Sequence, residues 1–273
     1  MALSVNTNIG AMTALQYLSG TQASMAATQN AISTGYKVAS AKDDGATYAI
    51  AQNMRGNVAA YSAVSDSLNR GMSAVDVAMS AGQSISDLLI QMKAKALASS
   101  DKSIDTASRV ALNNDFTALR DQIQTIVDNA SFNGFNLIKS GASDITALAS
   151  ADGTKKITVQ HQDLSLTGIG LTATSNISVQ SGATAMVGTI QTALTNVNKA
   201  LASFSAGAKK YSIQLGFVSK LSDTLTSGIG NLVDANMAAE SAKLTSLQTK
   251  QQLGVQALSI ANSSPQVVLS LFQ

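Results

Sequence analysis

A repeating apolar stripe constrains this chain more than any other feature of its sequence. Apolar or small residues recur with alternating spacings of three and four in the following series: Tyr61, Val64, Leu68, Gly71, Val75, Ala78, Gly82, Ile85, Leu89, Met92 and Ala96. An uninterrupted heptad pattern of this kind is typical of a long helix that packs along its length against other helices. Gly71 and Gly82 weaken the helix, but they allow a neighbouring backbone to approach closely.

Two further stretches carry the same helical pattern. Leu112, Phe116 and Leu119 begin a second stripe after a short break, so we expect this helix to pack antiparallel on the first, with Ser103 or Asp105 as its N-cap. A third stripe runs from Val187 to Leu232, and its register then shifts by one residue near position 233. A register shift of this kind marks a joint between two helical segments.

The middle of the chain differs in composition from the striped segments. In the run ASFNGFNLI an Asn-Gly pair stands between apolar residues, which predicts a tight turn. Gly, Ser, Thr and Asp are then frequent up to about residue 184, and the runs KKITVQ and LSLTGIGL alternate with a period of two. These patterns predict one or two small β-hairpins that face outward.

Both ends of the chain lack charged side chains. The first charged residue is Lys37, and none follows Lys250. Because an unpaired buried charge costs several kcal/mol, uncharged ends suit segments that are enclosed on all sides. Each end carries only a narrow apolar stripe, so we expect the two ends to pair with each other and with further copies. Near the C-terminus, Ser264 and Pro265 predict an N-cap and the first residue of a restarted last turn.

These patterns together predict a mainly α fold. We expect a long antiparallel coiled-coil or helix-bundle rod in which the N- and C-terminal helices are paired, with a small β-hairpin region in the middle of the chain. The expected parts are paired terminal helices in 1–42 and 236–273, a helical domain in 43–139 and 185–235, and an outward-facing β and loop region in 140–184 that belongs to the helical domain.

The composition argues against several classes of function. The chain has no cysteine and a single histidine, so disulfides, thiolate chemistry and the usual zinc sites are not expected. A net charge of +2 with 12% charged residues gives no nucleic-acid-binding patch, and no apolar run is long enough for insertion into a membrane. We interpret His161 as a surface residue and expect no catalytic residue, metal or cofactor, so the chain is not expected to be an enzyme.

Five short runs, found in this order, resemble bacterial flagellins: SVNTNIGAMTAL, ISTGYKVASAKDDGA, RGMSAVDVAMSAGQSI, ASFNGFNLI and ANSSPQVVLSLFQ. The resemblance covers nearly the whole chain apart from roughly 140–185. It implies a structural subunit that polymerises into the extracellular flagellar filament used for swimming, with the terminal helices in the filament core. It also implies export by the flagellar apparatus without a cleaved signal peptide, and ends that become ordered only on assembly.

The resemblance further implies partners and contact residues. The partners are further copies of the chain, other flagellins, an export chaperone on the C-terminal segment, and the filament cap and junction proteins. The residues that we predict to be buried between subunits are Val5, Ile9, Met12, Leu15, Leu18, Leu247, Leu258, Val268 and Leu271.

The Ser/Thr-rich stretch 158–195 suggests O-linked sugars, with an unmodified polar loop as the alternative. The candidate sites are Ser165, Thr167, Ser175, Ser178, Ser181 and Thr184.

Two other functions remain open at the level of the sequence. The first is a protein of the hook–filament junction type, which would cap growth instead of extending it. The second is a secreted coiled-coil adhesin or translocator, which would bind a membrane or a receptor as a monomer and form no helical polymer.

Overall fold

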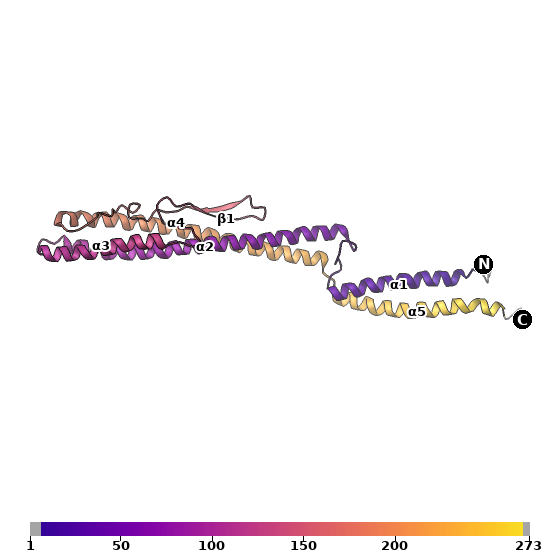
Figure 1. Cartoon of the computed structure of the whole chain (residues 1–273). Helices are drawn as coiled ribbons and strands as arrows, with labels where there is room; N and C mark the ends of the chain where they lie inside the picture. The colour runs from indigo at the N-terminus through magenta and orange to yellow at the C-terminus, as the bar shows by residue number, and fades with distance from the viewer. Residues whose placement is uncertain (1–6, 270–273) are drawn as a thin grey trace. The chain divides into compact units, whose positions relative to one another are not determined.

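A computed structural model describes residues 7–269 of the chain. Within this range the secondary-structure elements follow one another (Figure 1) as α1 (Ile9–Thr34), α2 (Gly45–Ser99), α3 (Thr106–Asn129), β1 (Ile145–Leu148), β2 (Lys156–Val159), α4 (Gln180–Val233) and α5 (Met237–Leu269). The predicted fold class is confirmed: the protein is mainly helical, the terminal helices α1 and α5 are paired, and the strands form one small antiparallel sheet.

The chain divides into two compact units. Unit 1 comprises Met1–Gly56 and Thr224–Gln273, and unit 2 comprises Asn57–Asp223. Helices α2 and α4 each contribute residues to both units. The domain boundaries expected from the sequence stay a prediction.

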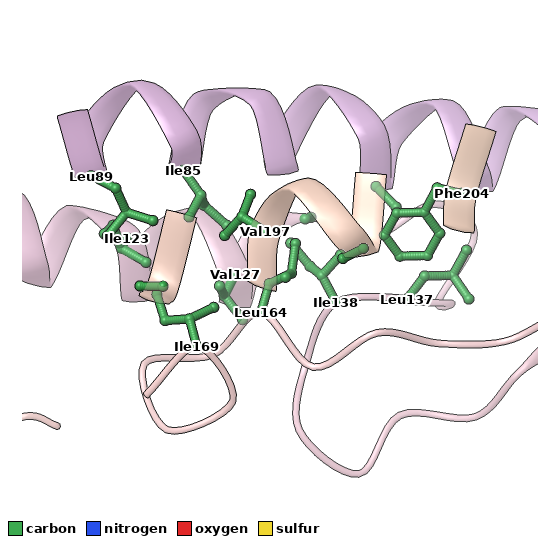
Figure 2. Close-up of a cluster of buried hydrophobic side chains, with 14 of the residues drawn as sticks. Ile85, Leu89, Ile123, Val127, Leu137, Ile138, Leu164, Ile169, Val197 and Phe204 are labelled. Atoms are coloured by element: carbon green, nitrogen blue, oxygen red, sulfur yellow. The ribbon is translucent and has the colours of Figure 1, made fainter. Parts of the chain in front are cut away.

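The core of unit 2 forms where the stripes of three helices meet. Every residue of the α2 stripe from Val64 to Ala96 is buried. Phe116, Ile123 and Val127 of α3 are fully buried against it, as is the α4 stripe formed by Ile190, Val197, Phe204, Tyr211 and Val218. Figure 2 shows Val197 and Phe204 of α4 in this cluster with Ile123 and Val127 of α3. The heptad pattern therefore predicted the buried faces of these helices correctly, because burial follows the helical period.

The segment between α3 and α4 packs onto this core. Its apolar side chains are buried in the same cluster as the helical stripes, and Figure 2 labels four of them, Leu137, Ile138, Leu164 and Ile169. Leu171 and Ile177 are buried in the same cluster. Strands β1 and β2 pair with Ile145 opposite Val159, so KKITVQ supplies one strand of a single hairpin. The predicted Asn-Gly turn is confirmed, since Asn133 and Gly134 both have positive φ between the bridged residues Phe132 and Phe135.

The second alternating run, LSLTGIGL, does not form a strand. The backbone N–H of Ile169 donates to Ser165 O at 3.0 Å, and that of Leu171 donates to Leu166 O at 2.7 Å, so the run folds into a compact turn. Leu164, Leu166 and Ile169 are buried in the core without a partner strand. The second hairpin that we allowed for is therefore absent among the described residues.

The glycines of the α2 stripe receive side chains from α4, not its backbone. A Cβ atom on Gly71 would lie 3.0 Å from Cε2 of Tyr211, and one on Gly82 would lie 2.8 Å from Cδ2 of Leu201. Tyr211 extends past Gly71, and its hydroxyl donates to Ile145 O at 3.2 Å, which ties α4 to the hairpin. Burial raises the pKa of the Tyr211 hydroxyl to about 12.

Gly207→Ala in α4 is expected to lower the free energy of unfolding by about 1–3 kcal/mol, because a Cβ there would lie 2.7 Å from Cγ2 of buried Val159. Gly216→Ala in the same helix is the matched control, since its Cβ would have no neighbour within 4 Å. The control is expected to raise stability by about 0.5–1 kcal/mol through helix propensity. Urea unfolding followed by circular dichroism measures both, and equal shifts of the same sign would contradict the close packing at Gly207.

The ends of the helices match the remaining sequence signals. Of the two candidate caps, Asp105 is the N-cap of α3, because its carboxylate accepts a hydrogen bond from the backbone N–H of Ser108 at 2.9 Å. The register shift near position 233 coincides with the joint between α4, which ends at Val233, and α5, which begins at Met237.

Candidate assembly surface on the terminal helix pair

A short backbone junction places the end of α1 beside the start of α5. Gly35 ends α1 with a left-handed φ of 77°, where glycine has no steric penalty. The backbone N–H of Lys37 then donates to Val233 O at 2.8 Å, and that of Ala235 donates to Gly35 O at 2.8 Å. These hydrogen bonds hold the two helix ends together, so α1 and α5 run antiparallel along each other.

Two aspartates shape the connection from α1 to α2. The Asp43 carboxylate accepts hydrogen bonds from the backbone N–H groups of Ala39 and Ser40, at 3.1 and 2.8 Å. Asp44 caps α2, because its carboxylate accepts from Ala46 and Thr47 N–H at 3.0 and 3.1 Å. Hydrogen bonds from Ser40 and Thr47, respectively, lower the pKa of these two carboxyl groups. Asp43 thus closes a turn, and Asp44 caps α2.

The interior of the α1–α5 pair is small. Among the described side chains of the two helices, only Leu18, Thr28 and Leu247 are buried. Gly254 of α5 lies opposite Leu18, and a Cβ atom there would be 3.3 Å from Leu18 Cδ1. The helices approach closely, but they bury few large side chains against each other.

The outer surface of the same pair is apolar. Eight large apolar side chains, each between 44% and 74% exposed, lie on it: Ile9, Met12, Leu15 and Tyr17 of α1, with Met237, Leu253, Val255 and Ile260 of α5. Helix α1 has no charged residue, and the charges of α5 are confined to Glu240, Lys243 and Lys250. We call these eight residues the outer apolar set.

A groove between the two helices opens onto this surface. Its volume is about 470 Å³, and it is lined by Ile9, Gly10, Thr13, Ala14, Tyr17, Gly254 and Ala257. Small residues form much of the lining, and no charged group is among them. Such a groove can accept apolar side chains.

The structure places the predicted contact residues in three different environments. Ile9, Met12 and Leu15 are exposed, Leu258 is half-buried, and Leu18 and Leu247 are buried inside the pair. Val5 and Leu271 lie outside the described residues, as does the side chain of Val268 in α5. Sequence reasoning missed the other five members of the outer apolar set, which are Tyr17, Met237, Leu253, Val255 and Ile260. The signal that could have found them is the lack of charge all around these segments.

The candidate sugar sites also differ in exposure. Ser165 is buried, and its hydroxyl accepts a hydrogen bond from Gly168 N–H at 3.2 Å, which makes it unsuitable for modification in the folded protein. Ser175 is half-buried and accepts a hydrogen bond from Thr172 N–H at 3.0 Å. The exposed candidates are Thr167, Ser178, Ser181 and Thr184.

The described part of the chain bears on three other kinds of site: a catalytic histidine, a metal site and a membrane-spanning helix. His161 Nδ1 lies 2.9 Å from Oδ1 of Asp144, and both side chains are more than one-third exposed. Residues 7–269 contain no group of three or more His, Cys, Asp or Glu residues placed to hold a metal ion. None of the helices over the same residues combines the length and the apolar character needed to cross a membrane.

A helix pair with a small interior, exposed large apolar side chains and few charges is the pattern of a structural protein that assembles with other chains. Residues 5–143 match the bacterial flagellin N-terminal helical region, and residues 187–272 match the bacterial flagellin C-terminal helical region. The chain therefore belongs to the bacterial flagellin family, whose members are the structural subunits of the extracellular flagellar filament.

Full-length relatives agree with this family, and solved structures share its fold. Flagellin FljK of Caulobacter vibrioides is 53% identical over 274 residues and covers 100% of both chains, and a Brucella melitensis flagellin is 35% identical over 99% of both. The crystal structure of Bacillus cereus flagellin covers 55% of this chain and 86% of its own, with a TM-score of 0.50 and 23% identity. A putative flagellar hook-associated protein from Vibrio parahaemolyticus covers 70% of this chain and 100% of its own, with a TM-score of 0.60 and 13% identity, and so shares the fold.

Proposed function

We propose that this flagellin polymerises through the outer apolar set of the α1–α5 pair, which becomes enclosed by the same helices of neighbouring copies. The observation that supports this most is the large apolar surface on both helices together with the absence of charge from α1. Full burial of a side chain of this size contributes about 1.5–3 kcal/mol. Half of the set would then contribute roughly 6–12 kcal/mol, which is comparable with the cost of association.

The small interior of the pair supports assembly-dependent order at the ends. Helices in water owe most of their stability to the packing of an apolar face. The pair has 26 residues in α1 and 33 in α5, yet it buries only three described side chains. In the proposed mechanism, unit 2 folds in the free subunit, and the terminal helices become stably ordered when neighbouring copies cover them. Leu18 and Leu247 then hold the pair together, while the outer set meets other subunits.

Export, partners and modification extend this proposal. Family membership and uncharged ends support export by the flagellar apparatus without a cleaved signal peptide, with an export chaperone on the C-terminal segment. Cap and junction proteins would contact the filament ends, and other flagellins would share the lattice. The exposed hydroxyl groups of Thr167, Ser178, Ser181 and Thr184 support O-linked sugars at these sites. The intact mass of subunits from native filaments tests the modification.

Seeded growth tests the proposed assembly. Purified chain, added to short filament seeds in polymerising salt, is expected to lengthen the seeds in electron micrographs and to sediment with them. Seeds without added chain are the control. Binding to seed ends that stops further growth would favour the junction-type alternative. Binding of the monomer to vesicles or cells, with no polymer at any concentration, would overturn the proposal in favour of a secreted binding module.

A further inference from the structure

The single proline of the chain lies within α5. Pro265 precedes the end of the helix at Leu269, and α5 continues through it without a break. The restart of the helix predicted at Ser264 and Pro265 is therefore wrong. Because proline has no backbone N–H, the carbonyl group four residues earlier, that of Ala261, lacks its normal helical donor. A partly buried carbonyl without a donor is unfavourable, so another donor is expected at Ala261.

The missing donor comes from the opposite end of the chain. The side-chain amide of Asn8 donates from Nδ2 to Ala261 O at 2.6 Å, across a sequence separation of 253 residues. The same side chain accepts a hydrogen bond at Oδ1 from the backbone N–H of Ala11, at 3.0 Å, and so caps the N-terminus of α1. One half-buried side chain thus binds a backbone N–H in the first turn of α1 and the carbonyl of α5 that has no i+4 donor.

Gly10 of α1 lies beside this bridge. A Cβ atom on Gly10 would be 3.4 Å from Asn8 Oδ1 and 3.9 Å from the Cβ atom of Ala261, which are ordinary van der Waals distances. The two helices are therefore in contact range at the point where the amide crosses from one to the other.

A side-chain amide carries its donor and its acceptor on two separate atoms, which suits simultaneous contacts to two helices. Asp is an equally good N-cap, but a carboxylate cannot donate and would place its charge against the Ala261 carbonyl oxygen. Apolar contacts within the pair, such as Leu18 against Gly254, are few and non-directional, so they distinguish poorly between alternative alignments. A directional bond to one particular carbonyl does distinguish them, because a shift by one helical turn moves that carbonyl by about 5.4 Å.

We propose that Asn8 is a positioning residue that sets the axial alignment of α1 on α5 by recognising the carbonyl group freed by Pro265. Its effect on filaments rests on the proposed assembly function, because the alignment decides how the outer apolar set of α1 is placed against that of α5. Asn8 and Pro265 act as a pair in this mechanism: the proline creates the free acceptor, and the asparagine uses it.

A double-mutant cycle in the full-length chain tests the pairing. Asn8→Asp keeps the cap and removes the donor, and Pro265→Ala restores the backbone N–H that Ala261 lacks. Asn8→Asp is expected to raise the critical concentration for seeded elongation roughly five- to hundredfold in the natural background. In the Pro265→Ala background, the same substitution is expected to raise it at least about fivefold less than in the natural background, because Ala261 then has its helical donor, whereas the added charge is the same in both.

If the effect of Asn8→Asp depends on whether residue 265 is proline or alanine, Asn8 acts through the Ala261 carbonyl and is not only a helix cap. An equal effect of Asn8→Asp in both backgrounds would overturn the inference, since the loss would then come from the cap or from the new charge alone. If the natural chain does not elongate seeds, the assembly proposal fails, and hydrogen exchange of the α1 amides in the isolated subunit carries the test. Asn8→Asp should then speed exchange only where Pro265 is present. In that case, the inference would also be overturned if the α1 amides of the natural chain showed no protection in the isolated subunit.

Discussion

Leu15→Asp is expected to raise the critical concentration for filament growth by at least about a hundredfold. Leu15 is 57% exposed on α1, so the substitution leaves the interior of the helix pair unchanged. In the proposed filament the residue is covered by neighbouring copies, and an unpaired carboxylate there would lose its water. The effective penalty is several kcal/mol per ion, and each 1.4 kcal/mol corresponds to a factor of ten in the equilibrium constant. Sedimentation of the polymer as a function of total protein concentration measures the change.

Leu15→Asn is the matched control, because asparagine has nearly the shape of aspartate but no charge. Its effect is expected to be at least tenfold smaller, since a neutral amide can find hydrogen-bond partners among the Ser, Thr and Gln side chains of these helices. Equal effects of the two substitutions would show that charge burial is not the cause. Normal growth of the Asp variant would remove Leu15 from the contact surface. The circular dichroism of both free subunits should match that of the natural chain.

Phe204→Ala is expected to lower the free energy of unfolding by about 3–5 kcal/mol, the usual cost of removing a buried aromatic ring. Phe204 has no exposed surface, and it belongs to the cluster in which Leu137 and Ile138 meet the long helices (Figure 2). The loss should also weaken the attachment of the segment between α3 and α4. Urea unfolding gives the change in free energy, and limited proteolysis around residues 140–184 reports whether that segment becomes more accessible.

Phe217→Ala, in the same helix, is the control for this substitution. Phe217 is 56% exposed, so its removal is expected to change the stability of the free subunit by less than about 0.5 kcal/mol. A loss of similar size at both positions would indicate that burial in the free subunit does not determine the response, because alanine favours the helix more than phenylalanine does. A small effect at Phe204 would contradict the tight packing of that cluster.

The helices of unit 2 were predictable because their signal is local and periodic. The stripe from Val64 to Ala96 is buried along its whole length, and the register shift near position 233 marks the joint between α4 and α5. Asp105 could be named beforehand as a candidate cap from its residue type and position. In each case the prediction depends on a few neighbouring residues. The helical repeat determines from their spacing which residues share a face and where the helix ends.

The period of two in LSLTGIGL was misleading because alternation does not itself require a partner strand. Leu164, Leu166 and Ile169 reach the core from a turn that carries its own backbone hydrogen bonds. Leu18 and Leu247 were expected between subunits, yet they fill the interior of the chain's own helix pair. Sequence periodicity identifies residues that are buried, but it does not identify the surface that buries them.

The sequence by itself determined the long helices, their buried faces, the tight turn at Asn133 and Gly134, and the uncharged character of both ends. These properties depend on residue types and on spacings of a few positions. Only the tertiary structure decided that the segment from Leu137 to Ile177 closes the core of unit 2, and that Asn8 meets Ala261. Such contacts depend on how distant segments come together in space, and the spacing of nearby residues carries no information about a partner 253 positions away.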